Sequence, residues 1–197
     1  MVSDNSKPAV FLDRDGTIIE EVGYIDSPDK VQLIAGADQA IKSFRNAGFK
    51  IIVVSNQSGV AHGYFDENTV LLINNRVAES FALNGAIIDA FYFCPHHPDI
   101  GDLDYRKDCE CRKPKPGMLL QAVEEHEIDL SKSIMIGDKY TDVKAGKSLN
   151  LISILVLTGF GEEEYQKIRS NGLQPEPDFV AQNIREAASF IKKQLNS

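Results

Sequence analysis

The stretch AVFLDRDGT, residues 9–17, indicates both the fold and the chemistry of this chain. Its first four residues are continuously apolar, which is typical of a strand buried on both faces of a sheet. Asp13 and Asp15 follow at once, and Gly16 and Thr17 complete the motif. Two like charges at a buried strand end are costly unless a cation or a proton shift relieves them. An ordinary turn also favours Asp and Gly, but the whole DRDGT run after an apolar strand favours a functional site.

Other apolar runs predict five more strands, at residues 50–55, 87–93, 133–137, 151–157 and 178–181. Amphipathic stretches between them predict helices near residues 36–47, 66–84, 116–127, 140–149, 161–170 and 183–195. This alternation predicts an α/β fold, a Rossmann-like parallel sheet flanked by helices on both faces. Sites in such sheets lie at the carboxyl ends of the strands. The residues that follow each strand are therefore the candidates for a site.

The composition limits the class of protein. A chain of 197 residues with 43% hydrophobic and 25% charged residues suits one globular domain, residues 1–197. The net charge of -8 argues against a nucleic-acid or membrane partner, because both need a basic surface. The N-terminus is polar, and no apolar run approaches the length of a membrane span. Three cysteines do not suggest a disulfide framework. We expect a monomeric cytoplasmic protein that acts on a small molecule.

Polar residues also follow the second and fourth predicted strands. The second ends in SNQSG (55–59), where Ser55 and Asn56 offer a hydroxyl and an amide to an anion, although such residues are common in loops. The fourth ends in GDKYTD (137–142), which contains Asp138 and Asp142. Carboxylates also act as caps at a helix N-terminus. Asp138, directly after the strand, is the stronger candidate of the two.

Positive charge is concentrated in residues 106–115. This segment holds two acidic residues and five basic ones, Arg106, Lys107, Arg112, Lys113 and Lys115. In an acidic chain, such a cluster supplies the local positive charge that an anionic substrate needs. Lys113 could equally be a solvated surface lysine.

The order Asp-x-Asp, Ser, Lys, Asp along the chain resembles the four motifs of the haloacid dehalogenase superfamily of phosphohydrolases. The resemblance implies that Asp13 is a nucleophile that forms an aspartyl-phosphate. It implies that Asp15 is the general acid for the leaving alcohol and then the base for water. Ser55 and Lys113 would hold the transferring phosphoryl group and stabilise its charge.

The same resemblance implies a Mg²⁺ site. Its ligands would be the side chains of Asp13 and Asp138 and the backbone carbonyl of Asp15, since Mg²⁺ prefers hard oxygen ligands. Asp142 is expected to lie behind these ligands rather than to bind the metal.

All three cysteines lie in one loop, CPHHPDIGDLDYRKDCECRKPKPG (94–117). Cys94, Cys109 and Cys111 with one of the histidines at positions 96 and 97 could form a tetrahedral Cys₃His zinc site. Free buried thiols, or one disulfide with a thiol left over, are the alternatives. The family resemblance favours His96 as the fourth ligand.

Four protein ligands leave no open coordination position, so this zinc would be structural. It would brace an inserted loop, residues 94–111, and thereby fix Arg112 and Lys113 beside the active site.

The chain has no room for a large cap domain between residues 55 and 113, and residues 20–35 form only a short flap. Several motifs closely resemble the bacterial heptose bisphosphate phosphatase family, which removes the 7-phosphate of D-glycero-D-manno-heptose 1,7-bisphosphate in nucleotide-activated heptose biosynthesis. They are DRDGTI, GYIDSPD, SNQSGVAHGYF, MIGDKYTD and the cysteine loop. The substrate contacts that this resemblance implies are Glu21, Val22, Gly23, Tyr24, Ser55, Asn56, Gln57, Ser58, Arg112, Lys113 and Lys139.

One position departs from that family, because His62 stands where arginine is usual. Histidinol-phosphate phosphatase, which shares the four motifs and the zinc loop, is the alternative activity. A non-catalytic, zinc-stabilised binding domain is a remote alternative, which the intact set of acidic residues and lysine disfavours.

Overall fold

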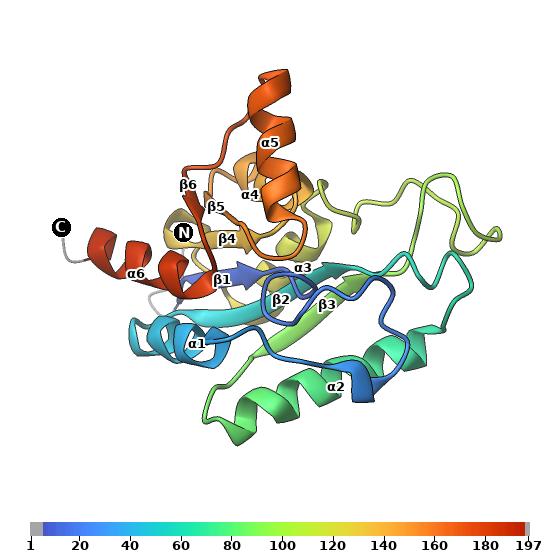
Figure 1. Cartoon of the computed structure of the whole chain (residues 1–197), viewed down its shortest axis with the longest axis horizontal. Coiled ribbons are helices and arrows are strands. Elements are labelled where there is room, and N and C mark those ends of the chain that lie inside the picture. The colour runs from blue at the N-terminus through green and yellow to red at the C-terminus, as the bar shows by residue number, and fades with distance from the viewer. Residues whose placement is uncertain (1–5, 196–197) are drawn as a thin grey trace.

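The computed structural model describes residues 6–195. Its centre is a six-stranded sheet in which all neighbouring strands are parallel, in the order β3-β2-β1-β4-β5-β6 (Figure 1). The strands are β1 (Ala9–Leu12), β2 (Lys50–Asn56), β3 (Ala90–Cys94), β4 (Ile134–Gly137), β5 (Ile152–Val156) and β6 (Phe179–Ala181). All six predicted strands are confirmed, and β3 begins three residues later than the apolar run suggested.

Six α-helices connect and cover the strands, as the amphipathic pattern predicted. They are α1 (Ala37–Asn46), α2 (Glu67–Leu83), α3 (Gly117–His126), α4 (Tyr140–Ser148), α5 (Gly161–Asn171) and α6 (Ile184–Leu195). The side chain of Asp66 caps α2 by accepting a hydrogen bond from the Thr69 N–H (2.8 Å). None of the described helices is both long enough and apolar enough to cross a membrane.

The strands β1, β2 and β4 each contribute to two cores, since successive side chains point to opposite faces. Val10 and Leu12 of β1 pack in one core with residues of α1, α2 and α6. Ala9 and Phe11 pack in the other with residues of α3. Burial on both faces explains why the strands read as unbroken apolar runs.

The strand order reverses beside β1, because the chain moves outward through β2 and β3 and then returns to place β4 on the other side of β1. Ligands of open α/β sheets bind at such a switch point, beyond the carboxyl ends of the strands. The motifs after β1 and β4 therefore meet there.

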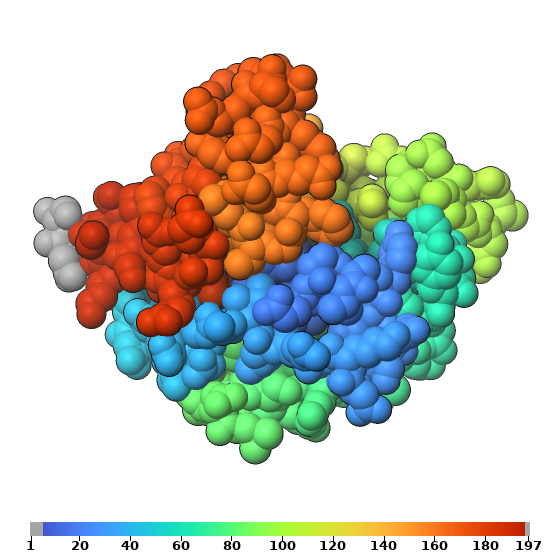
Figure 2. All heavy atoms as spheres, in the orientation of Figure 1, coloured from blue at the N-terminus to red at the C-terminus, as the bar shows by residue number. Residues whose placement is uncertain are grey.

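Two irregular segments lie around this edge. Residues 20–35 form the predicted flap, which contains a short 3-10 helix, η1 (Pro28–Lys30), and is anchored by the buried side chains of Ile25 and Ile34. The loop after β3 projects to the right in Figure 1. In Figure 2 the flap, in blue, lies below α5, in orange, and the yellow-green loop lies to the right of α5.

Candidate active site

The first and fourth strands bring two aspartates together. Asp13 directly follows β1, and its N–H donates to the carbonyl of Ile136 in β4 (2.9 Å). Asp138 directly follows β4. Both carboxylates are buried, at 5% and 0% exposure for Asp13 and Asp138. The sheet register therefore places these two predicted site residues at the same edge.

Lys113 reaches this edge from the loop after β3, and it is buried rather than solvated. Its Nζ lies 2.7 Å from Oδ1 of Asp13 and 2.6 Å from Oδ1 of Asp142, and it donates to the Val54 carbonyl (2.7 Å). Burial alone would lower the pKa of Lys113, but Asp13 and Asp142 raise it above its ordinary value. The ammonium group is therefore a permanent positive charge in the site.

The same contact sets the ionisation of Asp13. Burial acts to raise the pKa of Asp13, but the ammonium groups of Lys113 and Lys139 outweigh burial and hold this pKa below its ordinary value. An ionised carboxylate needs no base to become a nucleophile. Asp13 thus has the protonation state that nucleophilic attack on phosphorus requires.

Asp138 has the features of a cation ligand. The carboxylate oxygens of Asp13, Asp138 and Asp142 lie within 4.8 Å of one another. Oδ2 of Asp138 accepts from the Phe160 N–H (2.9 Å), whereas its buried Oδ1 has no hydrogen-bond partner among residues 6–195. Burial, followed by the charges of Asp13 and Asp142, raises the pKa of Asp138 to about 9. A bound Mg²⁺ would satisfy the unpartnered oxygen and offset this repulsion, so the residues fit the metal.

Asp142 is placed differently. Its Oδ1 pairs with Lys113 and its Oδ2 accepts from the Lys139 N–H (3.0 Å) at the start of α4. Oδ2 is therefore hydrogen-bonded, whereas the contact of Oδ1 is an ion pair. Asp142 also belongs to the carboxylate cluster with Asp13 and Asp138, so its expected place behind the metal ligands stays a prediction.

Two glycines leave the space that Asp138 occupies. A Cβ on Gly16 would lie 2.2 Å from Oδ2 of Asp138, and a Cβ on Gly159 would lie 2.3 Å from the same atom. Both glycines also have positive φ, +78° and +58°. The glycine of the DRDGT motif is therefore required by contact as well as by backbone conformation.

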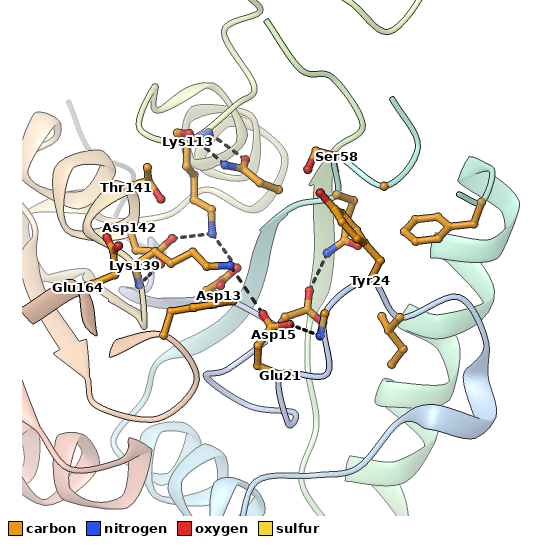
Figure 3. A pocket seen from close by; sticks show the side chains of 17 residues that line it. Asp13, Asp15, Glu21, Tyr24, Ser58, Lys113, Lys139, Thr141, Asp142 and Glu164 are labelled. Atoms are coloured by element: carbon orange, nitrogen blue, oxygen red, sulfur yellow. Dashed lines mark hydrogen bonds and ion pairs between the residues drawn. The ribbon is translucent and has the colours of Figure 1, made fainter. Parts of the chain in front are cut away.

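A cavity of about 470 Å³ opens above these residues (Figure 3). Most of the predicted catalytic and substrate residues line it: Asp13, Asp15, Glu21, Gly23, Tyr24, Asn56, Gln57, Ser58, Lys113 and Lys139. Asp138 lies beneath its floor, fully buried. The cavity thus joins the flap, the end of β2, the loop after β3 and the start of α4.

Three of the predicted substrate residues do not line this cavity. Val22 is 54% exposed on the flap, and Ser55 is buried with its Oγ accepting from the Gln57 Nε2 (3.2 Å). Arg112 donates through Nη1 to the His96 carbonyl (2.9 Å). Of the five basic residues in segment 106–115, all within the described chain, only Lys113 lines the cavity. The roles of Val22, Ser55 and Arg112 stay predictions.

Several lining residues were not identified from the sequence. They include Phe65, Thr141, Phe160 and Glu164. Thr141 is part of the GDKYTD motif and could have been considered, but Phe160 and Glu164 belong to the region after β5, which carried no motif. Glu164 also accepts from the Tyr140 N–H (3.1 Å), which ties α5 to the start of α4.

Glu21 and Lys139 connect the flap to the sheet edge. Lys139 Nζ lies 3.7 Å from Oε2 of Glu21 and 4.6 Å above the ring of Phe160. Glu21 Oε1 accepts from the Gly23 N–H (2.7 Å), and burial raises the pKa of Glu21 above its ordinary value. These groups place one acceptor and one cation next to each other in the wall of the cavity.

The cysteine loop forms a compact cluster. The sulfur atoms of Cys94 and Cys109 are 3.4 Å apart, and those of Cys109 and Cys111 are 3.2 Å apart. Nδ1 of His96 lies 3.6 Å from the Cys94 sulfur and 3.4 Å from the Cys111 sulfur. These distances are far too long for a disulfide bond, and they approach the roughly 3.8 Å edges of a tetrahedron built with Zn–S bonds of about 2.3 Å. The residues fit a closed zinc site.

The geometry distinguishes the two adjacent histidines. His96 points Nδ1 into the sulfur cluster, whereas Nδ1 of His97 accepts from the Asp99 N–H (3.2 Å). Hydrogen bonds from Cys94, Cys109 and His96 lower the pKa of Cys111 to about 5 against the opposing effect of burial. The same contact between Cys94 and Cys111 raises the pKa of Cys94 above its ordinary value, so without a metal Cys111 is the first of the two sulfurs to lose its proton.

The loop is fixed directly to the active site. The Asn56 side chain accepts from the Lys113 N–H and donates to the Lys113 carbonyl, both at 3.0 Å. Cys111 is two residues away from Lys113. A metal at the cysteine cluster would therefore hold the backbone from which the buried ammonium extends.

Comparisons with known proteins agree with this site. The HAD-hydrolase-like family model matches residues 110–187. The D-glycero-beta-D-manno-heptose-1,7-bisphosphate 7-phosphatase of Pasteurella multocida is 41% identical over 94% of this chain and 97% of its own length. The corresponding enzyme of Escherichia coli K12 is 37% identical over 96% of each chain.

A solved structure extends the likeness to the fold. The D,D-heptose 1,7-bisphosphate phosphatase of B. bronchiseptica, complexed with magnesium and phosphate, superimposes with a TM-score of 0.82 at 30% identity. The match covers 95% of this chain and 99% of that one. With the acidic cluster and the zinc-type loop in place, the chain belongs to the D-glycero-D-manno-heptose-1,7-bisphosphate 7-phosphatase family of haloacid dehalogenase-like hydrolases.

Proposed function

We propose that this protein is a Mg²⁺-dependent phosphatase that removes the 7-phosphate of D-glycero-D-manno-heptose 1,7-bisphosphate. One observation carries the proposal: Asp13, an ionised nucleophile candidate, and the buried ammonium group of Lys113 line one cavity, and the carboxylate of Asp138, which has an unpartnered oxygen, lies beneath them. The relatives named for this activity match nearly the whole chain.

In the proposed reaction, a carboxylate oxygen of Asp13 attacks the phosphorus, and the bond from phosphorus to the sugar oxygen breaks. Asp15 gives a proton to the departing sugar alkoxide. Asp15 then takes a proton from a water molecule that attacks the aspartyl-phosphate. Phosphate leaves as the bond between phosphorus and Asp13 breaks, which restores both carboxyl groups.

Positive charge is required throughout, because the phosphoryl group and Asp13 are both anionic. Lys113 supplies one fixed charge that no pH change near neutrality removes. Asp13 and Asp138, with the Asp15 carbonyl, would hold the Mg²⁺. When bound, this ion supplies further positive charge, which offsets the negative charge of the phosphate group and helps to orient it.

The rest of the cavity suits a polyhydroxylated substrate. Its wall offers acceptors on Glu21 and Glu164 and donors or mixed groups on Asn56, Ser58 and Lys139. Sugar hydroxyls both donate and accept, so a wall with both kinds of group can satisfy them. Tyr24 adds an aromatic face at the opening.

The cysteine cluster would hold a structural Zn²⁺ through Cys94, His96, Cys109 and Cys111. The proposal keeps the expectation of a single phosphatase domain, residues 1–197. The three cysteine sulfurs lie close together but form no disulfide bond. A cytoplasmic location fits this arrangement, since an oxidising compartment favours disulfides. A monomeric state is the remaining expectation, and gel filtration tests it.

The deciding experiment measures phosphate release with Mg²⁺ from both anomers of the heptose bisphosphate and from histidinol phosphate. We expect the higher kcat/KM on a heptose bisphosphate. A higher value on histidinol phosphate would replace the proposed substrate. The Asp13→Asn variant is the control: it should keep its fold and lose turnover, and retained turnover would refute Asp13 as the nucleophile.

A further inference from the structure

Arg14, the residue between the two motif aspartates, is fully buried, with 0% exposure. A buried guanidinium group is costly unless hydrogen bonds and an opposite charge compensate for lost hydration. Arg14 does not line the cavity. Any role of Arg14 in the site is therefore exerted through neighbouring residues and not by contact with the substrate.

The contacts of Arg14 converge on Asp15. Its Nη2 donates to both carboxylate oxygens of Asp15, at 3.1 Å to Oδ1 and 3.0 Å to Oδ2. Its Nε adds a longer bond to Oδ1 (3.3 Å). These three contacts hold both oxygens of the Asp15 carboxylate, so they fix the Asp15 rotamer.

Gln57 closes a ring of hydrogen bonds around the same carboxylate. Its Oε1 accepts from Arg14 Nη2 (2.9 Å), and its Nε2 donates to Asp15 Oδ2 (2.8 Å; Figure 3). The two bonds use opposite ends of one amide and so fix its orientation. Asp15 is therefore held from two directions.

Asn74 holds the far end of the guanidinium group. Its Oδ1 accepts from Arg14 Nη1 at 2.8 Å. Asn74 lies on α2, is 5% exposed, and belongs to a buried row in which its neighbours Val70, Ile73 and Val77 are apolar. A polar side chain at such a position is costly without a partner. Among residues 6–195, the side chain of Asn74 hydrogen-bonds to Arg14 alone, and Asn74 does not line the cavity.

We infer that Arg14 and Asn74 are positioning residues for the general acid and base: Asn74 fixes Arg14, and Arg14 fixes the direction in which Asp15 presents its carboxyl group. The inference rests on the proposed function, because it assigns Asp15 the proton transfers. It also gives α2, which supplies no residue to the cavity floor, a part in catalysis.

The expected effect follows from what a misplaced acid loses. General acid catalysis is worth about 10²–10⁴-fold, and a displacement of about 1 Å can cost about 10²-fold. Loss of the Asn74 contact should weaken proton donation most for leaving groups that need a proton. It should matter least for leaving groups that depart readily as anions.

The test is a leaving-group series of phenyl, 4-nitrophenyl and 2,4-dinitrophenyl phosphates, read as kcat/KM with Mg²⁺. In Asn74→Leu we expect kcat/KM on phenyl phosphate to fall at least about tenfold more than on 2,4-dinitrophenyl phosphate. A burst of dinitrophenolate should precede slow turnover, because hydrolysis of the aspartyl-phosphate still needs Asp15 as base. Asn74→Asp, which keeps an acceptor facing Arg14, should restore the wild-type dependence on leaving group.

The matched control is Asn75→Leu, the same change at the exposed neighbouring position on α2, which should leave the series unchanged. If Asn74→Leu lowers the thermal midpoint too far, Asn74→Ala removes the contact without adding a branched side chain. Equal losses on all three esters in a folded variant would overturn the inference, as would no loss.

The series also separates this inference from the proposed substrate. A wild-type enzyme that cleaves the aryl phosphates but neither heptose bisphosphate would refute the substrate assignment. The comparison of leaving groups would still decide the role of Arg14 and Asn74.

Discussion

Replacement of Lys113 by methionine would remove the ammonium group between Asp13 and Asp142 and leave a side chain of similar length. The ammonium is 2% exposed and lies within 2.7 Å of three oxygen atoms. Without it, Asp13 and Asp142 lose the ion-pair partner that they share, and Lys139 remains as a cation that acts on Asp13.

Breaking a buried ion pair from one side costs about 3–5 kcal/mol. For a chain of this size, each kcal/mol lowers the thermal midpoint by about 2–4 °C. The metal-free Lys113→Met variant should therefore unfold about 6–20 °C below the wild type. The difference between the two midpoints should widen as pH rises. In the folded variant the buried carboxylates avoid repulsion by staying protonated, whereas in the unfolded chain they ionise freely. Higher pH therefore favours the unfolded variant.

The assay is thermal unfolding in Mg²⁺-free buffer at several pH values, with Asp142→Asn and the double variant to complete a cycle. Removing one charge of each sign should cost less than the sum of the two single changes. Lys115→Met is the matched control, because Lys115 makes only exposed ion pairs, with Asp108 and Glu110, and should leave the midpoint unchanged. A Lys113→Met midpoint within 1 °C of the wild type at every pH would refute the reasoning.

Three further predictions concern metals and the space around them. Gly159→Ala should weaken the apparent Mg²⁺ affinity, because the new Cβ would lie 2.3 Å from Asp138 Oδ2. Gly172→Ala is the control: Gly172 has the same φ of +58° but no atom within 4 Å of the new Cβ, so only the backbone cost of about 1–2 kcal/mol should appear. Equal Mg²⁺ affinities in the two variants would contradict this prediction. Binding of Mg²⁺ at pH 7 should release a proton, since the pKa of Asp138 is raised from 3.8 to about 9 in the metal-free protein; the stability of the metal-free protein should also fall as pH rises from 3.8 to about 9. Calorimetric titration in two buffers with different ionisation enthalpies measures the proton release. A binding enthalpy that does not depend on the buffer would exclude it. A zinc-selective chelator, with Mg²⁺ in excess, should lower the thermal midpoint and kcat/KM together, because binding of a structural zinc can add on the order of 10 kcal/mol to the free energy of folding. A lower midpoint with unchanged kcat/KM would disprove the link from Cys111 to Lys113.

Much of the architecture follows from local pattern. Apolar runs identified all six strands, most clearly β1 and β4, because strands buried on both faces have no polar alternation. Helix ranges agreed to within one or two residues, since each amphipathic stretch is bounded by turn or capping residues such as Asp66 and Gly48. Asp13 and Asp138 were identifiable because each directly follows a strand, and the ends of parallel strands share one edge.

The candidate site was only partly predictable. Phe160 and Glu164 enter the cavity from the segment after β5, where no spacing or residue type marks them. Arg112 and Lys113 were both expected beside the substrate, yet Arg112 bonds to the backbone of its own loop while Lys113 enters the floor. The direction of a side chain depends on the local backbone, which a cluster of basic residues does not specify.

The sequence by itself determined the strands, the order of the four motifs and the grouping of every thiol in one loop, because these depend on residues adjacent in the chain. The tertiary structure alone decided that Lys113 joins Asp13 to Asp142 and that Asn74, 60 residues from Arg14, holds the guanidinium beside Asp15. Those contacts arise from strand order and from the packing of α2 on the sheet. Periodicity records which face of a helix is buried, but not which side chain of another element it will meet.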